Sequence, residues 1–399
     1  MGAVSAIHQF VPMLHRRDAV GQHTLGVQAE LSARGIDSAI YVELDDPETV
    51  AATRPATSYP SDARPGNVLV YQFATASDLA GWLGSRPEPL VVNYHNVTPA
   101  PLFAPWDNEL ARHQVRAHIE LSGLAARAAL GVAVSELNRG DLVQAGFAAT
   151  AVVPPIAALS AGPARRARPG RGDTTGAGPS GTGDRPRLRG ARWLAVGRLA
   201  PNKAVEDAVA ALLAYRAIHD PEAELLVVGR PAVPSYSAAL RRYAADLGLT
   251  GAVRFAGRVD DAALVSAYES ADVLVVASEH EGFCLPVVEA MAHLLPVVAY
   301  REGAVPETLG GAGVLIDNKD PVSIADAVRR LQADHDFRAA VVAAGTERVP
   351  ALRLDTAGQR LAELLEAVRD GSGWPDGADV QEPSPGNPGG PATGGQPAA

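Results

Sequence analysis

The sequence is poor in cysteine, with Cys284 as its single example among 399 residues. One cysteine can form neither an internal disulfide nor a cysteine metal cluster, which points to a reducing compartment. Its thiol is either a reactive group near a site or, as is commoner, a small residue packed beneath a loop. No apolar run approaches the ~20 residues of a membrane span. The stretch Ala3–Phe10 also lacks the basic segment of a signal peptide, so we expect a cytoplasmic protein.

Positive charge is in deficit as well. Lys and Arg number 35 against 45 Asp and Glu, which gives a formal net charge of −10. An acidic balance argues against a nucleic acid as partner. What the chain does contain is 47% hydrophobic residues, enough at this length for two domains with cores of their own.

Short apolar segments alternate with helical stretches over residues 1–158. Such alternation predicts an α/β domain with a parallel sheet covered by helices on both faces, and loops after the strands carry function. The expected strands of this half are Ala3–Phe10, Ala39–Val42, Val68–Gln72, Leu90–Tyr94, Gly131–Val134 and Ala151–Val153. The expected helices include Gly21–Ala33 and Asn108–Ala129.

The rest of the chain divides by composition. Residues 159–190 are rich in Gly, Pro, Arg, Ser and Thr, which predicts a flexible linker. Residues 191–350 return to alternating strands and helices, as a second domain would. Residues 351–370 carry apolar side chains at helical spacing. Residues 371–399 are mostly Gly, Pro, Ala and polar residues, and we predict a disordered tail there.

One stretch of the second domain, Ser278–Ala292, has the pattern of an anion site. It follows an apolar strand, Val273–Val276, and contains Gly282, which is free to adopt a positive φ. Pro286 suits the first turn of a helix that we expect to run to Leu294. The amide groups and the dipole of a helix N-terminus favour a phosphate.

Two carboxylates, Glu281 and Glu289, frame this turn. Carboxylates repel phosphate but accept hydrogen bonds from vicinal hydroxyls, as the acidic residue on a bound ribose does. A phosphate joined to hydroxyl-rich rings satisfies both features, so a nucleotide sugar fits. Farther up the chain, Gly197 ends an apolar segment, and Arg198 and Lys203 then supply two cations.

These motifs resemble retaining glycosyltransferases of the GT-B fold, family GT4. Glu281 and Glu289 stand seven residues apart, as in the E-x7-E motif of that family. The resemblance also covers Val196–Lys203, Val253–Val259 and Gly303–Glu307, in the expected order. It implies two Rossmann-like domains that face one another across a cleft, with the acceptor on the N-terminal side and the donor on the C-terminal side. The helix over 351–370 is then a candidate to cross back to the first domain.

On the donor side, the resemblance implies that Arg198 and Lys203 bind the diphosphate, that Glu281 holds sugar hydroxyls and that Glu289 holds the ribose. The two cations could instead be surface groups paired with Glu206 or Asp207. The remaining donor-side candidates are Gly21, Gly197, Gly229, Arg258, Val259, Gly282, Phe283, Cys284, Leu285 and Glu307. Two of these have another reading: Arg258 as an exposed, unrelated residue, and Glu307 as a first-turn glutamate favoured by the helix dipole.

On the acceptor side, His95 follows the strand Leu90–Tyr94 and titrates near neutrality. The resemblance implies that it orients the transferred sugar, whereas turn hydrogen bonds alone could also account for it. The other candidates are Asp18, Gln22, Asn96 and Ser135, of which Asp18 and Ser135 could equally be helix caps. The family often has two glycines where this chain has Val20-Gly21.

The activity implied is transfer of a sugar, with retention, from a UDP- or GDP-linked donor to a hydroxyl of a glycan, lipid or small metabolite. The catalytic candidates are Glu281, His95, Arg198 and Lys203. A nucleotide-sugar epimerase and a non-catalytic nucleotide-sugar-binding protein are the alternatives. We expect no cofactor and no metal, because cations already face the diphosphate. The arginine-bearing helix Asn108–Ala129 either rests on an anionic membrane or has a solvated face.

Overall fold

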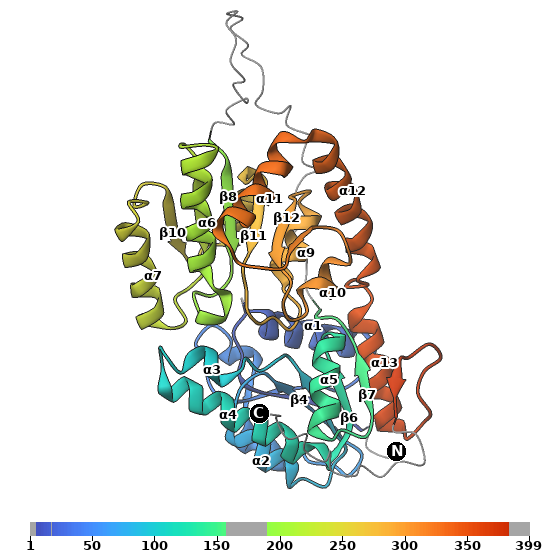
Figure 1. The fold of residues 1–399 in the computed structure, drawn as a ribbon. Coiled ribbons are helices and arrows are strands. Elements are labelled where there is room, and N and C mark those ends of the chain that lie inside the picture. The colour runs from blue at the N-terminus through green and yellow to red at the C-terminus, as the bar shows by residue number, and fades with distance from the viewer. Residues whose placement is uncertain (1–4, 17, 157–189, 383–399) are drawn as a thin grey trace, which may run out of the picture.

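The chain builds two α/β lobes, each around its own sheet (Figure 1). The structure is a computed structural model that describes residues 5–16, 18–156 and 190–382. The predicted linker, apart from Gly190, lies outside the described residues, as do residues 383–399 of the predicted tail.

The N-terminal sheet has the strand order β14-β7-β6-β5-β4-β1-β2-β3. All of its neighbours pair in parallel except β14 with β7. Its strands in chain order are β1 Ile7–Met13, β2 Ile40–Leu44, β3 Arg54–Pro55, β4 Val68–Phe73, β5 Leu90–Tyr94, β6 Ala128–Ala133, β7 Thr150–Val152 and β14 Val380–Gln381. The first strand therefore begins at Ile7 and not at Ala3. The Ala6 amide is bonded to the side chain of Asn67 at 3.1 Å rather than to a neighbouring strand.

The helices of this lobe are α1 Ala19–Ala33, α2 Asp78–Gly84, α3 Ala100–Phe103, α4 Asn108–Ala125 and α5 Glu136–Ala145, with short 3-10 turns η1 Val50–Ala52 and η2 Ala56–Ser61. The sequence had placed the end of α4 at Ala129, which is wrong. Ala128 instead pairs with Leu90, so sheet pairing takes these residues from the helix. Among the described residues, no helix is both long and apolar enough to cross a bilayer.

The C-terminal sheet is parallel throughout, in the order β10-β9-β8-β11-β12-β13. Its strands are β8 Arg192–Val196, β9 Glu224–Val228, β10 Val253–Gly257, β11 Val273–Val276, β12 Val297–Tyr300 and β13 Val314–Ile316. The order reverses between β8 and β11, and in doubly wound sheets ligands bind outside the carboxyl ends of the strands at such a point.

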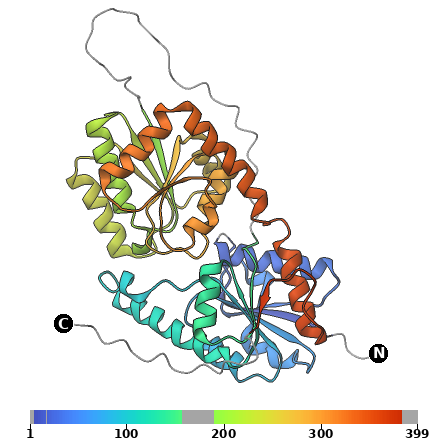
Figure 2. The ribbon, with the colours of Figure 1, turned by 45° about the vertical axis from the view of Figure 1, so that its right-hand side comes forward.

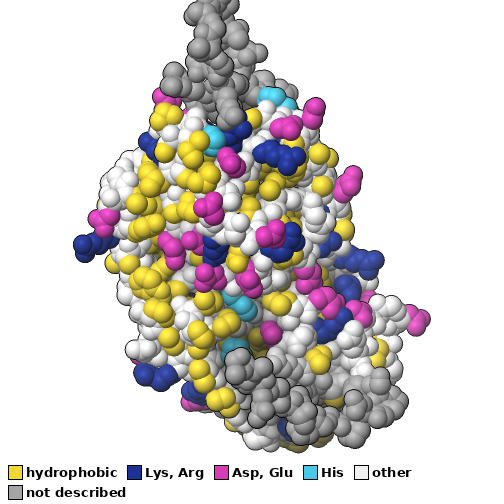
Figure 3. Space-filling model, in the orientation of Figure 1, with side chains coloured by type: hydrophobic (Ala, Val, Ile, Leu, Met, Phe, Trp, Pro, Cys, Tyr) yellow, Lys and Arg dark blue, Asp and Glu magenta, His cyan; other side chains and the backbone are white. Residues whose placement is uncertain are grey.

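Helices cover both faces of this second sheet (Figure 2). They are α6 Val205–Ile218, α7 Pro234–Asp246, α8 Asp261–Ser270, α9 Leu285–Ala292, α10 Val305–Leu309, α11 Pro321–Ala333 and α12 His335–Ala351, with the 3-10 turn η3 Pro201–Lys203. On the face drawn in Figure 3, acidic and basic side chains are interspersed rather than gathered into one large patch of a single sign.

After α12 the chain returns to the N-terminal lobe as α13, Ala357–Asp370. Leu361 and Leu365 of α13 are fully buried in a cluster with Val27 and Leu31 of α1. Arg34, which follows α1 directly, also pairs with Glu366 of α13 at 2.9 Å. The last helix thus completes the core of the first lobe (Figure 2).

The expectation of disorder from Gly371 onward is wrong for residues 371–382. Strand β14, Val380–Gln381, adds an antiparallel strand to β7 at the edge of the N-terminal sheet. Trp374 packs against the cluster that α13 completes, and Asp379 pairs with Arg139 of α5 at 2.9 Å. These contacts bury enough surface to order a segment whose composition alone predicts disorder.

Candidate active site

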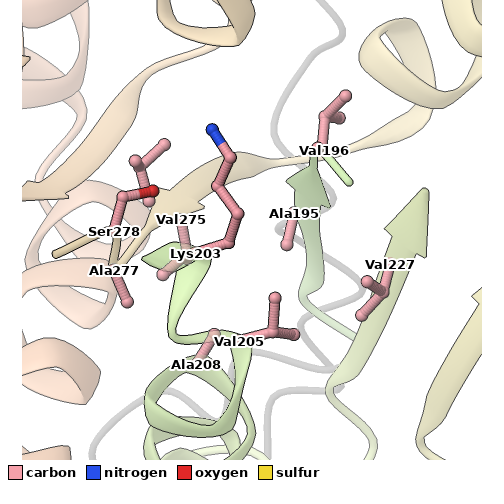
Figure 4. A pocket seen from close by; sticks show the side chains of 11 residues that line it. Ala195, Val196, Lys203, Val205, Ala208, Val227, Val275, Ala277 and Ser278 are labelled. Atoms are coloured by element: carbon pink, nitrogen blue, oxygen red, sulfur yellow. The ribbon is translucent and has the colours of Figure 1, made fainter. Parts of the chain in front are cut away.

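A charge pair lies where β8 and β11 end. The Lys203 ammonium donates to Oε1 of Glu281 at 2.6 Å, and the Ser278 hydroxyl donates to the same oxygen at 2.7 Å. Figure 4 shows Lys203 and Ser278 reaching over the strand ends. The Cys284 thiol also hydrogen-bonds this carboxylate, but a carboxylate has about four lone-pair sites and an ammonium has three N–H groups. The pair therefore keeps an acceptor and at least one donor for a ligand.

The two loops that carry this pair are tied together. The Asn202 side chain donates to the carbonyl of His280 at 3.2 Å, and the Glu279 amide donates to the carbonyl of Asn202 at 2.8 Å. Beneath them lies a pocket of about 20 Å³, room for roughly one water, lined by Gly197, Lys203, Ser278 and apolar strand residues (Figure 4). Bonds between the loops hold Lys203 and Glu281 at a fixed separation.

Arg198 follows Gly197 at the end of β8, beside Gly229 at the end of β9. A Cβ on Gly229 would lie 1.7 Å from the Gly197 carbonyl oxygen, so only glycine fits there. Solvent reaches the Arg198 side chain. Partial burial, and after it the positive charge of Arg230, lowers the pKa of the Arg198 guanidinium. The negative charge of Asp18 in the N-terminal lobe acts in the opposite direction and raises this pKa. This partly desolvated cation thus faces both lobes.

The turn after Glu281 differs from the expectation in one respect. The left-handed residue is Cys284, with φ of 70°, and not Gly282. Gly282 is needed for another reason, because a Cβ there would lie 2.4 Å from Cβ of Asn96 and 2.7 Å from Oδ1 of Asn138. Both neighbours belong to the N-terminal lobe, so this glycine permits the close approach of the two lobes.

Cys284 precedes α9, and Pro286 lies in the first turn of that helix. Burial raises the pKa of the Cys284 thiol well above its usual value, so it stays protonated and unreactive near neutral pH. The helix ends at Ala292, and Leu294 has a φ of 56°, which corrects the longer helix expected from the sequence.

Glu289 lies on α9 and accepts a hydrogen bond from the Tyr268 hydroxyl of α8 at 2.5 Å. Burial raises the pKa of Glu289, although the bond from Tyr268 acts the other way. The Tyr268 ring stacks on His293, with ring centroids 5.4 Å apart. The carboxylate of Glu289 is therefore held by a rigid neighbour.

Arg258 and Val259 follow β10 at the same edge of the sheet. Arg258 is exposed and Val259 is half-buried. The Glu48 amide, His15 and, at longer range, Arg258 hold the pKa of Asp46 below its usual value. Asp46 belongs to the N-terminal lobe, so Arg258 also lies toward the junction of the lobes.

Glu307 is placed differently from the other donor-side candidates. Its two carboxylate oxygens accept from the Glu136 amide at 2.9 and 3.1 Å, at the start of α5 in the opposite lobe. Ser135 caps the same helix by accepting from the Asn138 amide at 3.2 Å, and it is buried. Both side chains are thus engaged at the N-terminus of α5.

His95 and Asn96 extend from β5 to the junction. Asn96 is in the left-handed region, with φ of 78°. Its Oδ1 lies 2.9 Å from Nε2 of the His280 ring and accepts from the side-chain amide of Asn138 at 3.0 Å. Nε2 of His95 lies 2.7 Å from Oε1 of Gln72. Burial lowers the pKa of His95 to about 4, so the ring is neutral near pH 7 and does not titrate near neutrality as expected from the sequence.

The last three candidates, Asp18, Gly21 and Gln22, lie at the start of α1. Asp18 caps α1 by accepting from the Gly21 amide at 2.7 Å. A Cβ on Gly21 would lie 1.7 Å from the His15 carbonyl oxygen, so the turn itself requires this glycine. Gln22 is exposed on α1.

The structure therefore brings together Gly197, Arg198, Lys203, Gly229 and Glu281, with His95, Asn96 and Gly282 at the junction. Sequence reasoning missed the partners that hold these residues in place, which are Gln72, Asn138, Tyr268, Ser278 and His280. Ser278 and His280 lie inside the motif stretch, so only their roles were overlooked.

Part of the chain matches a known family. Residues 190–334 match the model of the family Glycosyl transferases group 1. A GDP-mannose-dependent alpha-(1-6)-phosphatidylinositol monomannoside mannosyltransferase of Mycobacterium tuberculosis is 33% identical over 193 residues, 46% of this chain and 48% of that protein. A D-inositol 3-phosphate glycosyltransferase of Corynebacterium kroppenstedtii is 36% identical over 131 residues, 32% of this chain and 29% of its own length. The matched region thus spans less than half the length of each of these curated relatives.

Solved structures cover nearly the whole chain. Sucrose-phosphate synthase from Thermosynechococcus elongatus has a TM-score of 0.68 at 20% identity, over 92% of this chain and 100% of that one. Anabaena HepE in complex with UDP and glucose has a TM-score of 0.67 at 17% identity, over 91% and 100%. At these identities the likeness shows the fold, which is GT-B with two Rossmann-like domains.

Proposed function

Because residues 190–334 belong to the group 1 glycosyl transferases, we propose that the chain transfers a sugar from a nucleotide-diphosphate donor to a hydroxyl acceptor. One observation carries this proposal. The Lys203–Glu281 pair lies at the carboxyl ends of β8 and β11, next to Arg198, with a donor and an acceptor left for a ligand. Cations beside a hydroxyl-binding carboxylate match a phosphate linked to a sugar.

In this proposal Arg198 and Lys203 stabilise the diphosphate. Negative charge builds up on a departing diphosphate in the transition state, and fixed cations in a partly desolvated site oppose it. Lys203 keeps its bond to Glu281 while a second N–H turns to a phosphate oxygen. The two cations would then supply the charge that a metal supplies elsewhere.

Glu281 and Glu289 would bind the two hydroxyl-bearing rings of the donor. Oε2 of Glu281 would accept from the sugar, and Glu289, held by Tyr268, would accept from the ribose. A UDP- or a GDP-linked sugar fits these contacts. One relative is named as GDP-mannose-dependent, and HepE is described in complex with UDP.

We propose transfer with retention, without a side chain as base. His95 is neutral near pH 7, with a pKa of about 4, and is a weak base there. The bond from the sugar carbon to the diphosphate oxygen would break as the acceptor oxygen bonds to that carbon from the same face. The acceptor proton would pass to the departing phosphate oxygen. The acceptor class would be a glycan, a lipid at a membrane surface or a small metabolite.

The test is a donor screen followed by product analysis. Thermal shifts with UDP- and GDP-linked sugars identify the donor, because a ligand of the native state raises the melting temperature. Mass spectrometry then separates a glycosylated acceptor from an isomerised donor, the product of an epimerase, and from binding without turnover. A glycosylated acceptor supports the proposal. An isomerised donor, or a failure of every donor to shift the melting temperature, contradicts it.

A further inference from the structure

Three neighbouring strands of the N-terminal sheet each carry one buried amide side chain near the junction of the lobes. These are Gln9 on β1, Gln72 on β4 and Asn93 on β5, and none is exposed to solvent. Gln72 and Asn93 lie side by side in the register of β4 with β5. A buried amide needs partners for its N–H groups and for its oxygen, so the orientation of each restricts the next.

The row of three amides, Gln9, Gln72 and Asn93, begins at the main-chain carbonyl of Thr24, which can only accept a hydrogen bond. Nε2 of Gln9 donates to the main-chain carbonyl of Thr24, within α1, at 3.0 Å. Oε1 of Gln9 then accepts from Nε2 of Gln72 at 2.8 Å, which turns Oε1 of Gln72 toward His95. That oxygen lies 2.7 Å from Nε2 of His95, and an oxygen there requires a proton on the ring nitrogen.

We propose that Gln72 is a positioning residue that holds His95 as the Nε2–H tautomer, which leaves Nδ1 as an acceptor for a hydroxyl of the ligand. No described residue is bonded to Nδ1. His95 adjoins Asn96, which contacts the C-terminal lobe through His280, so the ring lies beside the junction. The tautomer does not depend on the proposed function. The identity of the ligand hydroxyl as part of a sugar does.

At the other end of the row, His23 favours the opposite orientation of the amides. Its Nδ1 faces the Ile156 amide at 3.0 Å, and its Nε2 faces the Asn93 side-chain amide at 2.6 Å. A neutral imidazole accepts at one nitrogen only, so one of these two donors must turn away. Nδ2 of Asn93 also donates to Oε1 of Gln72 at 3.1 Å, so Asn93 can turn only if the whole row turns with it. Reversing the whole row would satisfy His23 but would set the oxygen of Gln9 against the Thr24 carbonyl.

A clash at the Thr24 carbonyl would cost more free energy than an unmet donor at His23. Thr24 is fully buried within α1, and its carbonyl cannot rotate without breaking the helix. Ile156 lies beyond the end of β7, outside any helix or strand, and is half-buried, so a small shift of its main chain breaks no regular set of hydrogen bonds. An unmet buried polar group is the more expensive outcome. The direction set by Thr24 is therefore kept, and the unmet groups lie at the far end of the row, at the Ile156 amide and at Oδ1 of Asn93, which has no partner among the described residues.

A fixed tautomer limits what can bind at His95. An unprotonated Nδ1 accepts from an O–H group and repels carboxylate, phosphate and carbonyl oxygens, which carry lone pairs alone. Burial lowers the pKa of His95 to about 4, so the ring does not become a cation that would attract such oxygens near pH 7. The site therefore selects a hydrogen-bond donor, which on a sugar is a hydroxyl.

The test uses the full chain with ¹⁵N-labelled histidine. Long-range ¹H–¹⁵N spectra report which ring nitrogen carries the proton, and His95→Gln assigns the signal. We expect protonated Nε2 in the wild type at pH 7.5 and a mixture of tautomers in Gln72→Met. Gln28→Met is the matched control, because Gln28 is a polar neighbour of Gln9 without a contact to His95, and it should leave the tautomer unchanged.

A proton on Nδ1 in the wild type would overturn the proposal, as would an unchanged tautomer in folded Gln72→Met. If Gln72→Met fails to fold, the wild-type spectrum still decides. Once a donor and an acceptor are known, Gln72→Met should lower kcat/KM about tenfold, the worth of one hydrogen bond of ~1.4 kcal/mol. A deoxy donor sugar that lacks the hydroxyl bound by His95 should show the same tenfold lower kcat/KM with the wild type. With Gln72→Met it should show no further decrease. Absence of transfer by any pair refutes the proposed function and leaves the tautomer result standing.

Discussion

The two lobes approach the same junction with opposite chemistry. On the C-terminal side the residues are charged and sit on turns: Arg198, Lys203 and Glu281. On the N-terminal side Asp18 lies toward Arg198, but the residues that extend from β5, His95 and Asn96, are neutral, with His95 backed by the buried amide of Gln72. The contrast indicates a division of labour, in which one lobe binds the anionic part of a ligand and the other binds its hydroxyls.

The backbone differs between the lobes in the same way. Gly197, Gly229, Ala204 and Cys284 all have positive φ around the C-terminal half of the site, so its turns are specified by local conformation. Asn96 is the corresponding residue on the N-terminal side. There, most of the geometry comes from the order of the strands.

The largest effect should follow from Lys203→Ala, which removes a cation of the C-terminal side. We expect turnover to fall about 10³-fold, the loss typical of a group that stabilises transition-state charge. The thermal shift produced by the donor should also disappear, while the circular dichroism spectrum stays that of the wild type.

The chain offers a matched control for this variant, because Lys319 is its second and last lysine. Lys319 pairs with Asp207 and Glu279, each at 3.0 Å. Lys319→Ala should keep its activity. Equal losses in the two variants would remove the diphosphate role of Lys203.

Gly282→Ala should break the approach of the lobes while sparing the donor side. The new methyl group would lie 2.4 Å from Cβ of Asn96, so the lobes must separate. We expect turnover to fall about 10²-fold, since displacement of reacting groups by ~1 Å can cost that much. The donor should still raise the melting temperature. Gly140→Ala on α5, where a Cβ meets no atom within 4 Å, is the control. Unchanged turnover in Gly282→Ala would mean that the contact is not needed.

Local pattern predicted most of the fold from the sequence. The strands at Leu90–Tyr94 and Val273–Val276 have the bounds expected from their apolar runs. Errors arose where a distant partner decides the outcome. Ala128 belongs to β6 because it pairs with Leu90, and Ala6 is held by Asn67.

The candidate site shows the same limit. The motif around Glu281 could be read because its residues are close in sequence. The bonds of Gln72 to Gln9 and His95 require β1, β4 and β5 to be neighbours, and the sequence does not reveal strand order. A usable signal was present, since an amide in an otherwise apolar strand needs a buried partner.

The ordered segment after α13 gives a smaller effect, on stability. A chain that ends at Asp370 loses β14, the packing of Trp374 and the pair between Asp379 and Arg139. We expect its free energy of unfolding to fall by about 2–3 kcal/mol, within the usual range for lost packing and pairing. Urea unfolding measures this, and a chain that ends at Glu382, which keeps these contacts, is the control. Equal stability of the two chains would contradict the role of β14.

The smallest effect, and the one that compares the lobes most directly, is their response to acid. Burial lowers the pKa of His8, His23 and His95 in the N-terminal lobe. The unfolded chain, with histidine pKa near 6.5, then binds more protons than the native state below that pH. Each such histidine should cost the N-terminal lobe up to about 1.4 kcal/mol per pH unit as the pH falls below 6.5 toward the lowered pKa of that ring, which for His95 is about 4.

The C-terminal lobe should respond differently. Burial raises the pKa of Glu206 and Glu289 above 4.5, so the native state binds more protons than the unfolded chain just above that pH. Their contribution to stability therefore grows as the pH falls, and it opposes the loss from His280, whose pKa burial lowers.

Hydrogen exchange at pH 7 and 5, corrected for intrinsic rates, should show that the stability of the N-terminal lobe falls more than that of the C-terminal lobe. In the double variant His23→Gln, His95→Gln that difference should shrink. Equal weakening of both lobes in the wild type would contradict the contrast between a neutral and a charged side of the junction.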